Sequence, residues 1–351
     1  MGRTTVRVGF RLDANINVAT GHMMRCVSIA NKCRELGMKC IFIISDTSNE
    51  EILQKNQFEY HVINAPWDDW NAGINEVTNY IEYAGIDFLV VDSYLVTEEF
   101  MTDVNRHVPV MYIDDMCRCA YDISFALHYS QWPEEDILQK LYDGKKTGLL
   151  TGMKYMPLRD EFSSRKKVTS VKKQIMLTTG GTDQYHITQR LARMILEDER
   201  FKDYTCVAVL GRMNSDRQAM DNMAEHEKRL VVLQNISNMA EIMRQSAVAV
   251  SGGGTSIYEL CACNTPTVCV AFAEDHVAFA QKMESHGILK YAGDARIDTD
   301  GVLRKTVECI YEILSTPEYI SRCRINMSRI IDGNGALRIA EYIQKNIGQQ
   351  K

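Results

Sequence analysis

Short apolar runs alternate with longer, helix-length stretches through the first half of the chain. The runs VRVGF, KCIFIIS, EYHVIN, DFLVVDSY and VPVMYIDD predict strands within residues 6–10, 39–45, 59–64, 87–94 and 108–115. Between the first two runs, Met23, Val27, Ala30 and Leu36 approximate one helical stripe, and Gly37 is expected to end that helix. Strands that are apolar on both faces and alternate with helices indicate a parallel sheet covered on both sides.

The same alternation begins again in the second half, with apolar runs at residues 174–181, 205–211, 230–236, 247–254 and 267–273. We therefore predict an α/β protein of two doubly wound, Rossmann-like domains that face a cleft, comprising residues 1–162 and 163–351. The basic stretch 163–173 has no periodic pattern and is interpreted as the linker. Residues 316–351 predict two helices separated at 332–336, and packing of the last helix back on the first domain is left open.

The composition narrows the range of functions. A length of 351 residues fits two domains, and a formal net charge of -6 does not indicate a general nucleic-acid or membrane-surface binder. The apolar runs are too short to span a membrane, and no secretory signal is recognisable, so we expect a cytoplasmic protein. The 11 cysteines include Cys117/Cys119 and Cys261/Cys263 but show no zinc spacing, so we expect free thiols and no metal.

The first strand-to-helix junction, RLDANINVATGHMMRC, contains a candidate for catalysis. Ligands of open parallel sheets gather at the carboxyl ends of the strands, where Arg11 and Asp13 lie. Gly21 allows a tight turn into the helix, and His22 falls in its first turn. The helix dipole favours a neutral imidazole that can accept a proton, whereas a nearby diphosphate would favour the charged form. An exposed histidine at a helix start, without a chemical role, is the alternative interpretation.

The glycine-rich loop SGGGTSIYE lies between an apolar strand and a helix. Gly253 and Gly254 let the backbone approach a ligand, and the N–H groups at the helix start favour an anion such as phosphate. Thr255 and Ser256 can cap the helix or donate to phosphate oxygens, and Glu259 can accept from ribose hydroxyls. The loop is neither G-x-G-x-x-G nor a lysine-containing P-loop, so a nicotinamide cofactor and ATP hydrolysis are not indicated. A plain capped turn is the alternative.

A third loop, TTGGTD at residues 178–183, repeats this arrangement with Gly180 and Gly181. Together with the loop at 251–259 and with His22, it predicts a ligand held in a cleft between the domains. Polar residues after other strands are weaker candidates, because each can contact a sugar or nucleotide but can also cap the following helix. These residues are Asp92, Tyr94, Asp114, Asp115, Asp275 and His276. The tryptophans lack interleaved basic residues, so no stacking surface for nucleic acid is expected.

Several separated motifs, in order along nearly the whole chain, resemble one family. They are RLDANINVATGHMMRC, VVDSY, YIDD, KYMPLRDEF, TTGGTD, SGGGTSIYE and DGNGALRI. The chain is similar to the UDP-2,4-diacetamido-2,4,6-trideoxy-β-L-altropyranose hydrolases of the pseudaminic acid pathway, which resemble glycosyltransferases of the GT-B type. The resemblance implies release of UDP by attack of water at the anomeric carbon of the sugar, with inversion. It also implies a role in nonulosonic acid and polysaccharide biosynthesis, including flagellin glycosylation.

The resemblance also assigns roles to residues. His22 matches the family's general base, and Arg11, Asp13, Gly21 and Tyr94 match positions near the sugar. The diphosphate would lie at residues 253–256, close to the glycines of the 178–183 loop, and the ribose at Glu259. The family usually has Asn-Gln where this chain has Asp275-His276, which leaves a different sugar open. No cofactor or metal is implied, and we expect a monomer whose partners are the UDP-sugar and UDP, without nucleic acid or membrane.

Two other functions remain as alternatives. A glycosyltransferase would use the same cleft and base but would move the sugar to an alcohol. A nucleotide-sugar binding protein that has lost catalysis would bind without turnover. The first domain shows no strong apolar or basic face for a membrane-bound acceptor, which favours hydrolysis. The presence of His22 together with Arg11 and Asp13 argues against a protein that only binds.

Overall fold

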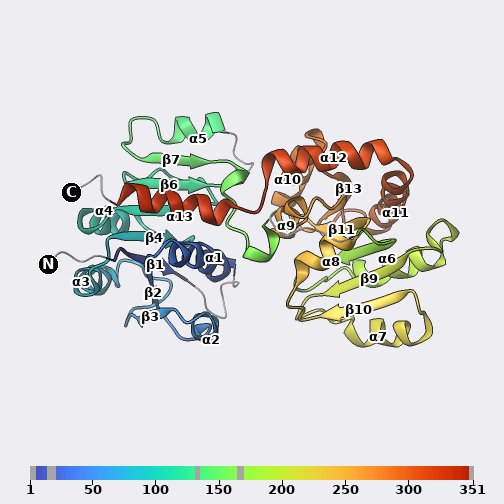
Figure 1. The fold of residues 1–351 in the computed structure, drawn as a ribbon, viewed down its shortest axis with the longest axis horizontal. Coiled ribbons are helices and arrows are strands. Elements are labelled where there is room, and N and C mark those ends of the chain that lie inside the picture. The colour runs from blue at the N-terminus through green and yellow to red at the C-terminus, as the bar shows by residue number, and fades with distance from the viewer. Residues whose placement is uncertain (1–4, 14–20, 131–134, 164–169, 348–351) are drawn as a thin grey trace. The chain divides into compact units, whose positions relative to one another are not determined.

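The computed structural model describes residues 5–13, 21–130, 135–163 and 170–347 (Figure 1). The chain divides into two compact units. The first unit comprises residues 1–160 and 334–351, and the second comprises residues 161–333. Part of the predicted linker, 164–169, and part of the first strand-to-helix junction, 14–20, lie outside the described residues.

The first unit is built on a seven-stranded, all-parallel sheet with the order β3-β2-β1-β4-β5-β6-β7. Its strands are β1 (Arg7–Leu12), β2 (Lys39–Ile44), β3 (Glu59–Val62), β4 (Phe88–Asp92), β5 (Val110–Ile113), β6 (Phe125–His128) and β7 (Gly148–Thr151). The register sets Phe10 of β1 beside Phe42 of β2 and Val90 of β4. Every residue of β4 is buried, which explains why its sequence is apolar on both faces.

Helices cover both faces of this sheet. They are α1 (Gly21–Glu35), α2 (Glu50–Lys55), α3 (Ile74–Ala84), α4 (Glu98–His107), α5 (Glu135–Leu141) and α13 (Gly335–Asn346), with a short 3-10 helix η1 (Met153–Tyr155). Side chains of α3 and α4 share one apolar cluster with Leu89 and Val91 of β4. Because side chains alternate along a strand, Val90 points to the opposite face. Gly37, with φ 82°, ends α1 in the left-handed conformation, as its sequence predicts.

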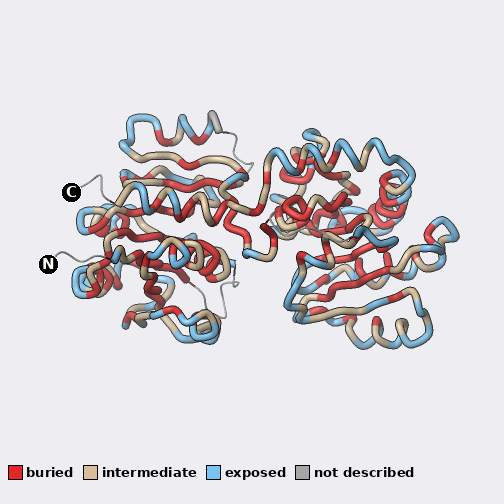
Figure 2. Tube along the Cα trace, viewed as in Figure 1, coloured by how far each residue is buried: buried red, intermediate tan, exposed pale blue. Residues whose placement is uncertain are grey.

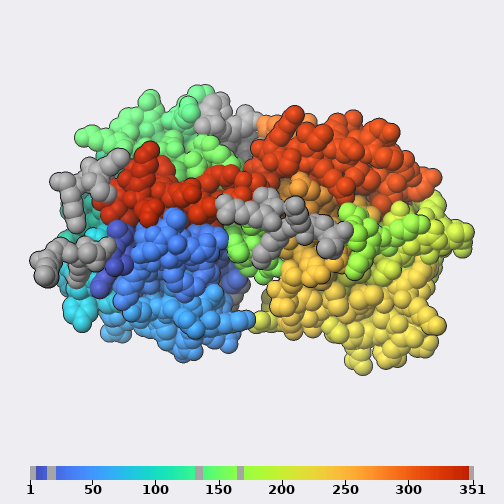
Figure 3. All heavy atoms as spheres, in the orientation of Figure 1, coloured from blue at the N-terminus to red at the C-terminus, as the bar shows by residue number. Residues whose placement is uncertain are grey.

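The helix α13 belongs to the first unit although it lies at the far end of the sequence. It runs beside α1, and Figure 3 shows its red atoms next to blue atoms of the N-terminal part of the chain. The side chain of Gln344 donates to the carbonyl of Leu36, 308 residues away, at 3.1 Å. The rings of Tyr342 and Phe125 also meet edge to face, with centroids 5.1 Å apart. The division between units therefore does not follow a single cut in the chain.

The second unit repeats the same design with a six-stranded parallel sheet in the order β10-β9-β8-β11-β12-β13. Its strands are β8 (Gln174–Thr178), β9 (Thr205–Leu210), β10 (Leu230–Gln234), β11 (Val248–Gly252), β12 (Thr267–Ala271) and β13 (Lys290–Asp294). Its helices are α6 (Ile187–Glu197), α7 (Arg217–His226), α8 (Met239–Gln245), α9 (Ser256–Ala262), α10 (Glu274–Ser285), α11 (Thr299–Ser315) and α12 (Pro317–Ile330), and the 3-10 helices are η2 (Asp160–Phe162), at the boundary, and η3 (Glu199–Phe201). Buried strands form the centre of both units in Figure 2.

The two sheets confirm the predicted fold class of two doubly wound, parallel α/β domains. In each sheet the first three strands are added in one direction, and the fourth strand then pairs with the other edge of the first. The switch point of the strand order therefore lies between β1 and β4 in the first sheet and between β8 and β11 in the second. The loops after these strands diverge at that switch point and leave room for a ligand. The three candidate loops of the sequence analysis follow β1, β8 and β11, which are strands at these switch points.

Candidate functional site

His22 is buried against a carboxylate at the switch point of the first unit. It is the second residue of α1 and is 5% exposed, so it is not an exposed helix-start residue. Its Nδ1 lies 2.6 Å from Oδ1 of Asp92, the last residue of β4. A carboxylate cannot donate, so Nδ1 carries the hydrogen, and Nε2 of the neutral ring keeps a lone pair that can accept a proton. This is the arrangement of a histidine base oriented by a carboxylate.

Arg25 joins this pair from the next turn of α1. Its guanidinium donates to both carboxylate oxygens of Asp92, and it also contacts Asp115 and the hydroxyl of Tyr129. Burial by itself raises the pKa of Asp92, but the charges and hydrogen bonds of Arg25 and His22 outweigh it and hold that pKa well below its usual range. Asp92 is therefore a carboxylate at neutral pH and Arg25 is its principal counter-charge.

Tyr94 stands beside the His22–Asp92 pair. Its ring meets the imidazole edge to face, with centroids 4.6 Å apart and an interplanar angle of 73°. Its hydroxyl donates to Asp115 at 3.4 Å, and the residue is 47% exposed. Asp92 and Asp115, which the sequence marked only as weak candidates, thus lie close to Tyr94 and His22. Tyr94 combines contact with His22 and access to solvent, which is what a ligand-contacting residue needs.

Arg11 and Asp13 lie deeper than their predicted role near the sugar would suggest. Arg11 is 1% exposed, and its guanidinium stacks on the indole of Trp70 at 4.0 Å. It donates to the carbonyl of Leu12 at 2.7 Å and lies 3.3 Å from Asp13. Asp13 in turn accepts from Ser93 at 2.5 Å and from the Trp70 indole at 3.0 Å. These contacts hold the loops after β1 and β4 together, so the two residues can serve as structural support for the site.

Burial shifts both members of this cluster toward their neutral forms. It lowers the pKa of Arg11 and raises the pKa of Asp13, while their mutual attraction opposes both shifts. Their position near a sugar remains a prediction. Gly21, the first residue of α1, is exposed, and a Cβ there would meet nothing within 4 Å.

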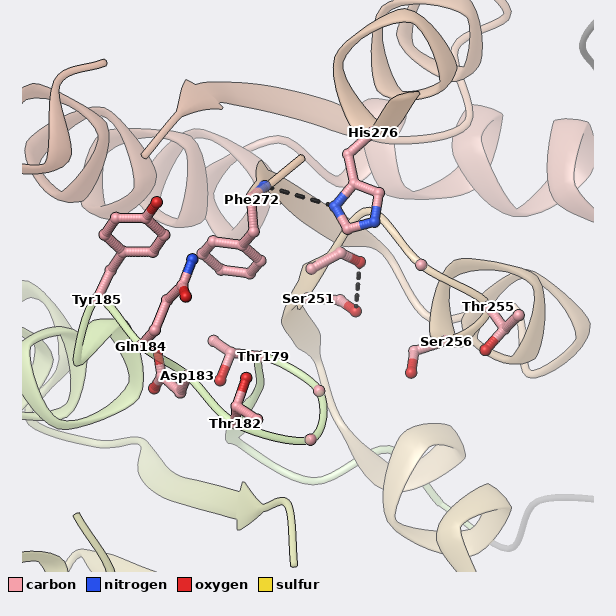
Figure 4. A pocket seen from close by; sticks show the side chains of 14 residues that line it. Thr179, Thr182, Asp183, Gln184, Tyr185, Ser251, Thr255, Ser256, Phe272 and His276 are labelled. Atoms are coloured by element: carbon pink, nitrogen blue, oxygen red, sulfur yellow. Dashed lines mark hydrogen bonds between the residues drawn. The ribbon is translucent and has the colours of Figure 1, made fainter. Parts of the chain in front are cut away.

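The second unit has a pocket of about 370 Å³ at the carboxyl ends of β8, β11 and β12 (Figure 4). The residues that line it are Thr179, Gly180, Gly181, Thr182, Asp183, Gln184, Tyr185, Ser251, Gly252, Gly254, Thr255, Ser256, Phe272 and His276. Gly180 has φ 95°, a conformation that side chains rarely adopt. At Gly252 a Cβ would lie 2.9 Å from the ring of Phe272, so glycine permits the close approach of these walls.

The donors in this pocket suit an anion. Thr255 does not cap α9 through its side chain, and its hydroxyl and that of Ser256 line the pocket. Asp183, the acid among the lining residues, accepts from the N–H groups of Ile187 and Thr188 at 2.9 and 2.8 Å. Its charge is therefore directed at the start of α6. The described lining residues include no lysine or arginine, so backbone N–H groups and hydroxyls would be the donors to a phosphate.

His276 completes the pocket as a neutral donor. The backbone N–H of Phe272 donates to its Nδ1 at 3.4 Å, which places the ring hydrogen on Nε2. Burial lowers the pKa of the imidazole, against the opposing charge of Asp275. Figure 4 shows the ring above Ser251 at the end of β11. A neutral imidazole with a hydrogen on Nε2 can donate to a ligand oxygen.

Three of the predicted nucleotide-binding residues stand outside the described lining of this pocket. Gly253 is buried beneath His276, where a Cβ would lie 2.6 Å from the His276 Cβ. Glu259 is partly buried on α9, and Asp275 is exposed in the first turn of α10. Their contacts with a nucleotide remain predictions. Gly180, Gly181, Gly254, Thr255, Ser256 and His276 all line the pocket.

Sequence reasoning missed Arg25, Trp70 and Ser93 in the first unit and Tyr185 and Phe272 in the second. Arg25 had a readable signal, because residues three apart on a helix share a face and Arg25 follows His22 at that spacing. The other four depend on contacts between segments far apart in sequence. Within the described ranges, no group of three histidine, cysteine or acidic residues could hold a metal, and the 11 cysteines are unpaired.

The two parallel Rossmann-like units define the GT-B fold of glycosyltransferases and related enzymes. Residues 175–324 match the model of the glycosyltransferase family 28 C-terminal domain, which places this match on the second unit. MurG of Acinetobacter baumannii has a similar structure, with a TM-score of 0.69 and 12% identity over 97% of this chain and 99% of that one. The Staphylococcus aureus MnaA–UDP structure has a TM-score of 0.67 and 12% identity over 99% of both chains.

Two curated relatives are also similar in sequence. The uncharacterized protein MJ1062 of Methanocaldococcus jannaschii is 20% identical over 274 residues, which cover 75% of this chain and 55% of that protein. The spore coat polysaccharide biosynthesis protein SpsG of Bacillus subtilis is 22% identical over 214 residues, covering 60% of this chain and 62% of SpsG. The chain thus spans little more than half the length of these relatives.

Proposed function

We propose that the protein is a nucleotide-sugar hydrolase that releases UDP from a UDP-linked diacetamido-trideoxy sugar. The observation that carries this proposal is the 2.6 Å contact between His22 Nδ1 and Asp92, which leaves Nε2 as a proton acceptor at the switch point of the first unit. A base in this position suits activation of a water molecule. The neighbouring Tyr94, half-exposed, is available to contact the sugar.

The proposed reaction proceeds by a single displacement. His22 Nε2 takes a proton from water while the water oxygen forms a bond to the anomeric carbon. The bond from that carbon to the UDP oxygen breaks, UDP leaves with the electron pair, and the configuration inverts. Asp92 holds the imidazole in the tautomer that accepts the proton and stabilises the imidazolium that forms.

The glycine-rich pocket of the second unit is the proposed UDP site. Its donors are the hydroxyls of Thr255 and Ser256, the Nε2–H of His276 and the backbone of the glycine loops. The match of residues 175–324 to the family 28 C-terminal domain supports this assignment, and the similar MnaA structure is a complex with UDP. Preorganised N–H and hydroxyl donors can stabilise the charge that develops on the leaving diphosphate.

We also propose a biosynthetic role in pseudaminic acid-type nonulosonic acids and in flagellin glycosylation. The motifs that resemble the hydrolase family support it, and the relative SpsG is named for spore coat polysaccharide biosynthesis. A cytoplasmic monomer that acts on the soluble UDP-sugar is part of this proposal. No helix within the described residues combines the length and apolar character needed to cross a bilayer.

A His22→Ala variant tests the proposed base. UDP release from UDP-linked diacetamido sugars should fall by a factor on the order of 10²–10⁴, because general-base catalysis contributes about that much. UDP affinity, measured by calorimetry, should stay unchanged. His107→Asn is the matched control, since His107 pairs with Glu82 at 3.0 Å on the surface of the same unit. Wild-type turnover in His22→Ala would overturn the assignment.

A glycosyltransferase is the second candidate, and the family 28 match favours it. The same base would then deprotonate an alcohol instead of water. A panel of UDP-linked amino sugars, incubated with and without acceptor alcohols, separates the two reactions. Rapid UDP release without an acceptor, together with a free sugar of inverted configuration, identifies the hydrolase. Release that requires an alcohol and yields a glycoside identifies the transferase.

A further inference from the structure

Arg25 contacts the carboxylate partners of both His22 and Tyr94. It donates to Asp92, which holds His22, and to Asp115, which accepts from Tyr94. Asp92 ends β4 and Asp115 follows β5, so one guanidinium ties two neighbouring strand ends to α1. The Arg25 side chain is 10% exposed and that of Asp92 is fully buried. Their interaction is therefore screened little by solvent.

Arg25 also stands directly beside the imidazole. Its Nη2 lies 3.0 Å from His22 Nδ1, and both of these nitrogens reach Asp92 Oδ1. Nδ1 carries the hydrogen that it donates to Asp92, so it cannot accept one from Arg25, and the contact between the two nitrogens is not a hydrogen bond. It places a permanent positive charge next to the ring that must become positive when it accepts a proton.

We propose that Arg25 is a positioning residue that sets the proton affinity of His22 by sharing Asp92 with it. This inference rests on the proposed role of His22 as general base. Arg25 neutralises part of the Asp92 charge and repels a protonated ring, and both effects make His22 hold its proton less tightly. A base that binds its proton too tightly would already be protonated near neutral pH and could not act on water.

The other groups that face His22 do not reverse this sign. Asp92 and Tyr94 approach from β4 and the loop after it, and Asp13 from the end of β1. Cys26, on α1, donates to Asp92 at 3.5 Å, and burial and the Asp92 charge raise its thiol pKa, so it stays neutral. Asp115 and Tyr129 contact Arg25 directly. Arg11 pairs with Asp13 at 3.3 Å, whereas Arg25 is the cation in direct contact with the His22 ring.

The test is a titration of the His22 ring in Arg25→Gln. With carbon-13-labelled histidine, NMR gives the pH midpoint of each ring, and His22→Asn identifies the His22 signal. Removing Arg25 should move the His22 midpoint upward by about one pH unit, the size expected for a single adjacent charge. The acid limb of the pH–rate profile should move upward by the same amount. Arg25→Lys keeps the charge and should keep the midpoint close to that of the wild type.

Two further variants keep the outcome interpretable. Arg34→Gln removes an exposed arginine from the same helix and should leave the His22 midpoint unchanged. If Arg25→Gln alone does not fold, the double variant with Asp115→Asn removes one charge of each sign and should still show an upward shift, smaller than that of Arg25→Gln, because the contact with His22 itself is made by Arg25. An unchanged midpoint in either folded variant overturns the proposal. Activity that survives His22→Ala would instead overturn the hydrolase assignment, and the NMR titration would still report the coupling.

Discussion

The six strands of the second sheet follow the same order as the first six of the seven-stranded sheet, but the two units carry different side chains at the switch point. At the switch point of the first unit, His22 and Arg25 both bond the buried carboxylate of Asp92, so the polar groups of this cluster are paired with one another. At the switch point of the second unit, glycines and hydroxyls line an open pocket of about 370 Å³. The topology therefore determines where a ligand site forms, and the loop residues determine what it does.

The difference also has an energetic side. A buried carboxylate such as Asp92 costs several kcal/mol unless it is paired and hydrogen-bonded, and here it has three such partners, including Arg25 and His22. The pocket of the second unit has little buried charge available to a ligand, because the carboxylate of Asp183 already accepts hydrogen bonds from N–H groups at the start of α6. The first site is organised before any ligand binds, whereas the second offers donors that a ligand must satisfy.

Replacing Asp92 by Asn should distinguish the roles of the two units most strongly, because it changes the site of the first unit alone. Arg25 would hold the amide oxygen, so the amide NH₂ would face His22 Nδ1 and stabilise the wrong tautomer. We expect kcat for UDP release to fall by roughly 10²–10⁴-fold, as when the carboxylate of a histidine base is amidated elsewhere. UDP affinity, which we assign to the second unit, should not change in calorimetry.

Glu82→Gln is the matched control for this change, because Glu82 is the carboxylate partner of His107 on the surface. It should leave both kcat and UDP affinity at wild-type values. A loss of UDP affinity in a folded Asp92→Asn variant, equal to its loss of kcat, would contradict the division of roles between the units.

Two adjacent glycines of the second unit should respond differently to alanine. At Gly253 a Cβ would lie 2.6 Å from the His276 Cβ, so Gly253→Ala forces α10 to shift and should cost about 1–3 kcal/mol of folding stability. At Gly254 a Cβ meets nothing within 4 Å, so Gly254→Ala should keep the wild-type Tm. Because Gly254 lines the pocket, the added methyl group should keep a phosphate from approaching the backbone closely, and UDP should bind about tenfold more weakly, as if roughly one charged hydrogen bond were weakened.

Thermal unfolding and calorimetry on the two variants check this contrast. Gly254→Ala with wild-type UDP affinity would remove the proposed phosphate role of the loop. Gly253→Ala with a wild-type Tm would show that His276 moves aside without cost.

The sequence predicted the scaffold better than the sites. Central strands such as β4 and β11 are buried on both faces, so their apolar runs were readable. The strands β6 and β7 were missed because their apolar runs are only three and two residues long, and β13 was missed because it begins and ends with a charged residue. The pairing of His22 with Asp92, 70 residues away, depends on the strand order and has no local pattern.

His276 offers the smallest expected effect and probes the second unit alone. Burial lowers the pKa of its imidazole below the ordinary 6.5. As the pH falls below about 6.5, the unfolded chain takes up this proton before the folded one, so this residue reduces stability on the acid side. His276→Asn should therefore show a smaller drop in Tm between pH 7.5 and 5.5 than the wild type.

Binding of UDP should move the His276 titration in the opposite direction. A diphosphate near Nε2 favours the charged ring, so saturating UDP should raise the NMR midpoint of His276 by a few tenths of a unit to about one unit. The histidine signal absent from His276→Asn identifies the residue, and the surface residue His107 serves as the internal comparison that UDP should leave unchanged. If UDP lowers the His276 midpoint or leaves it where it was, the diphosphate does not lie beside this ring. The nucleotide would then have to bind with its phosphates toward the hydroxyls of Thr255 and Ser256 alone.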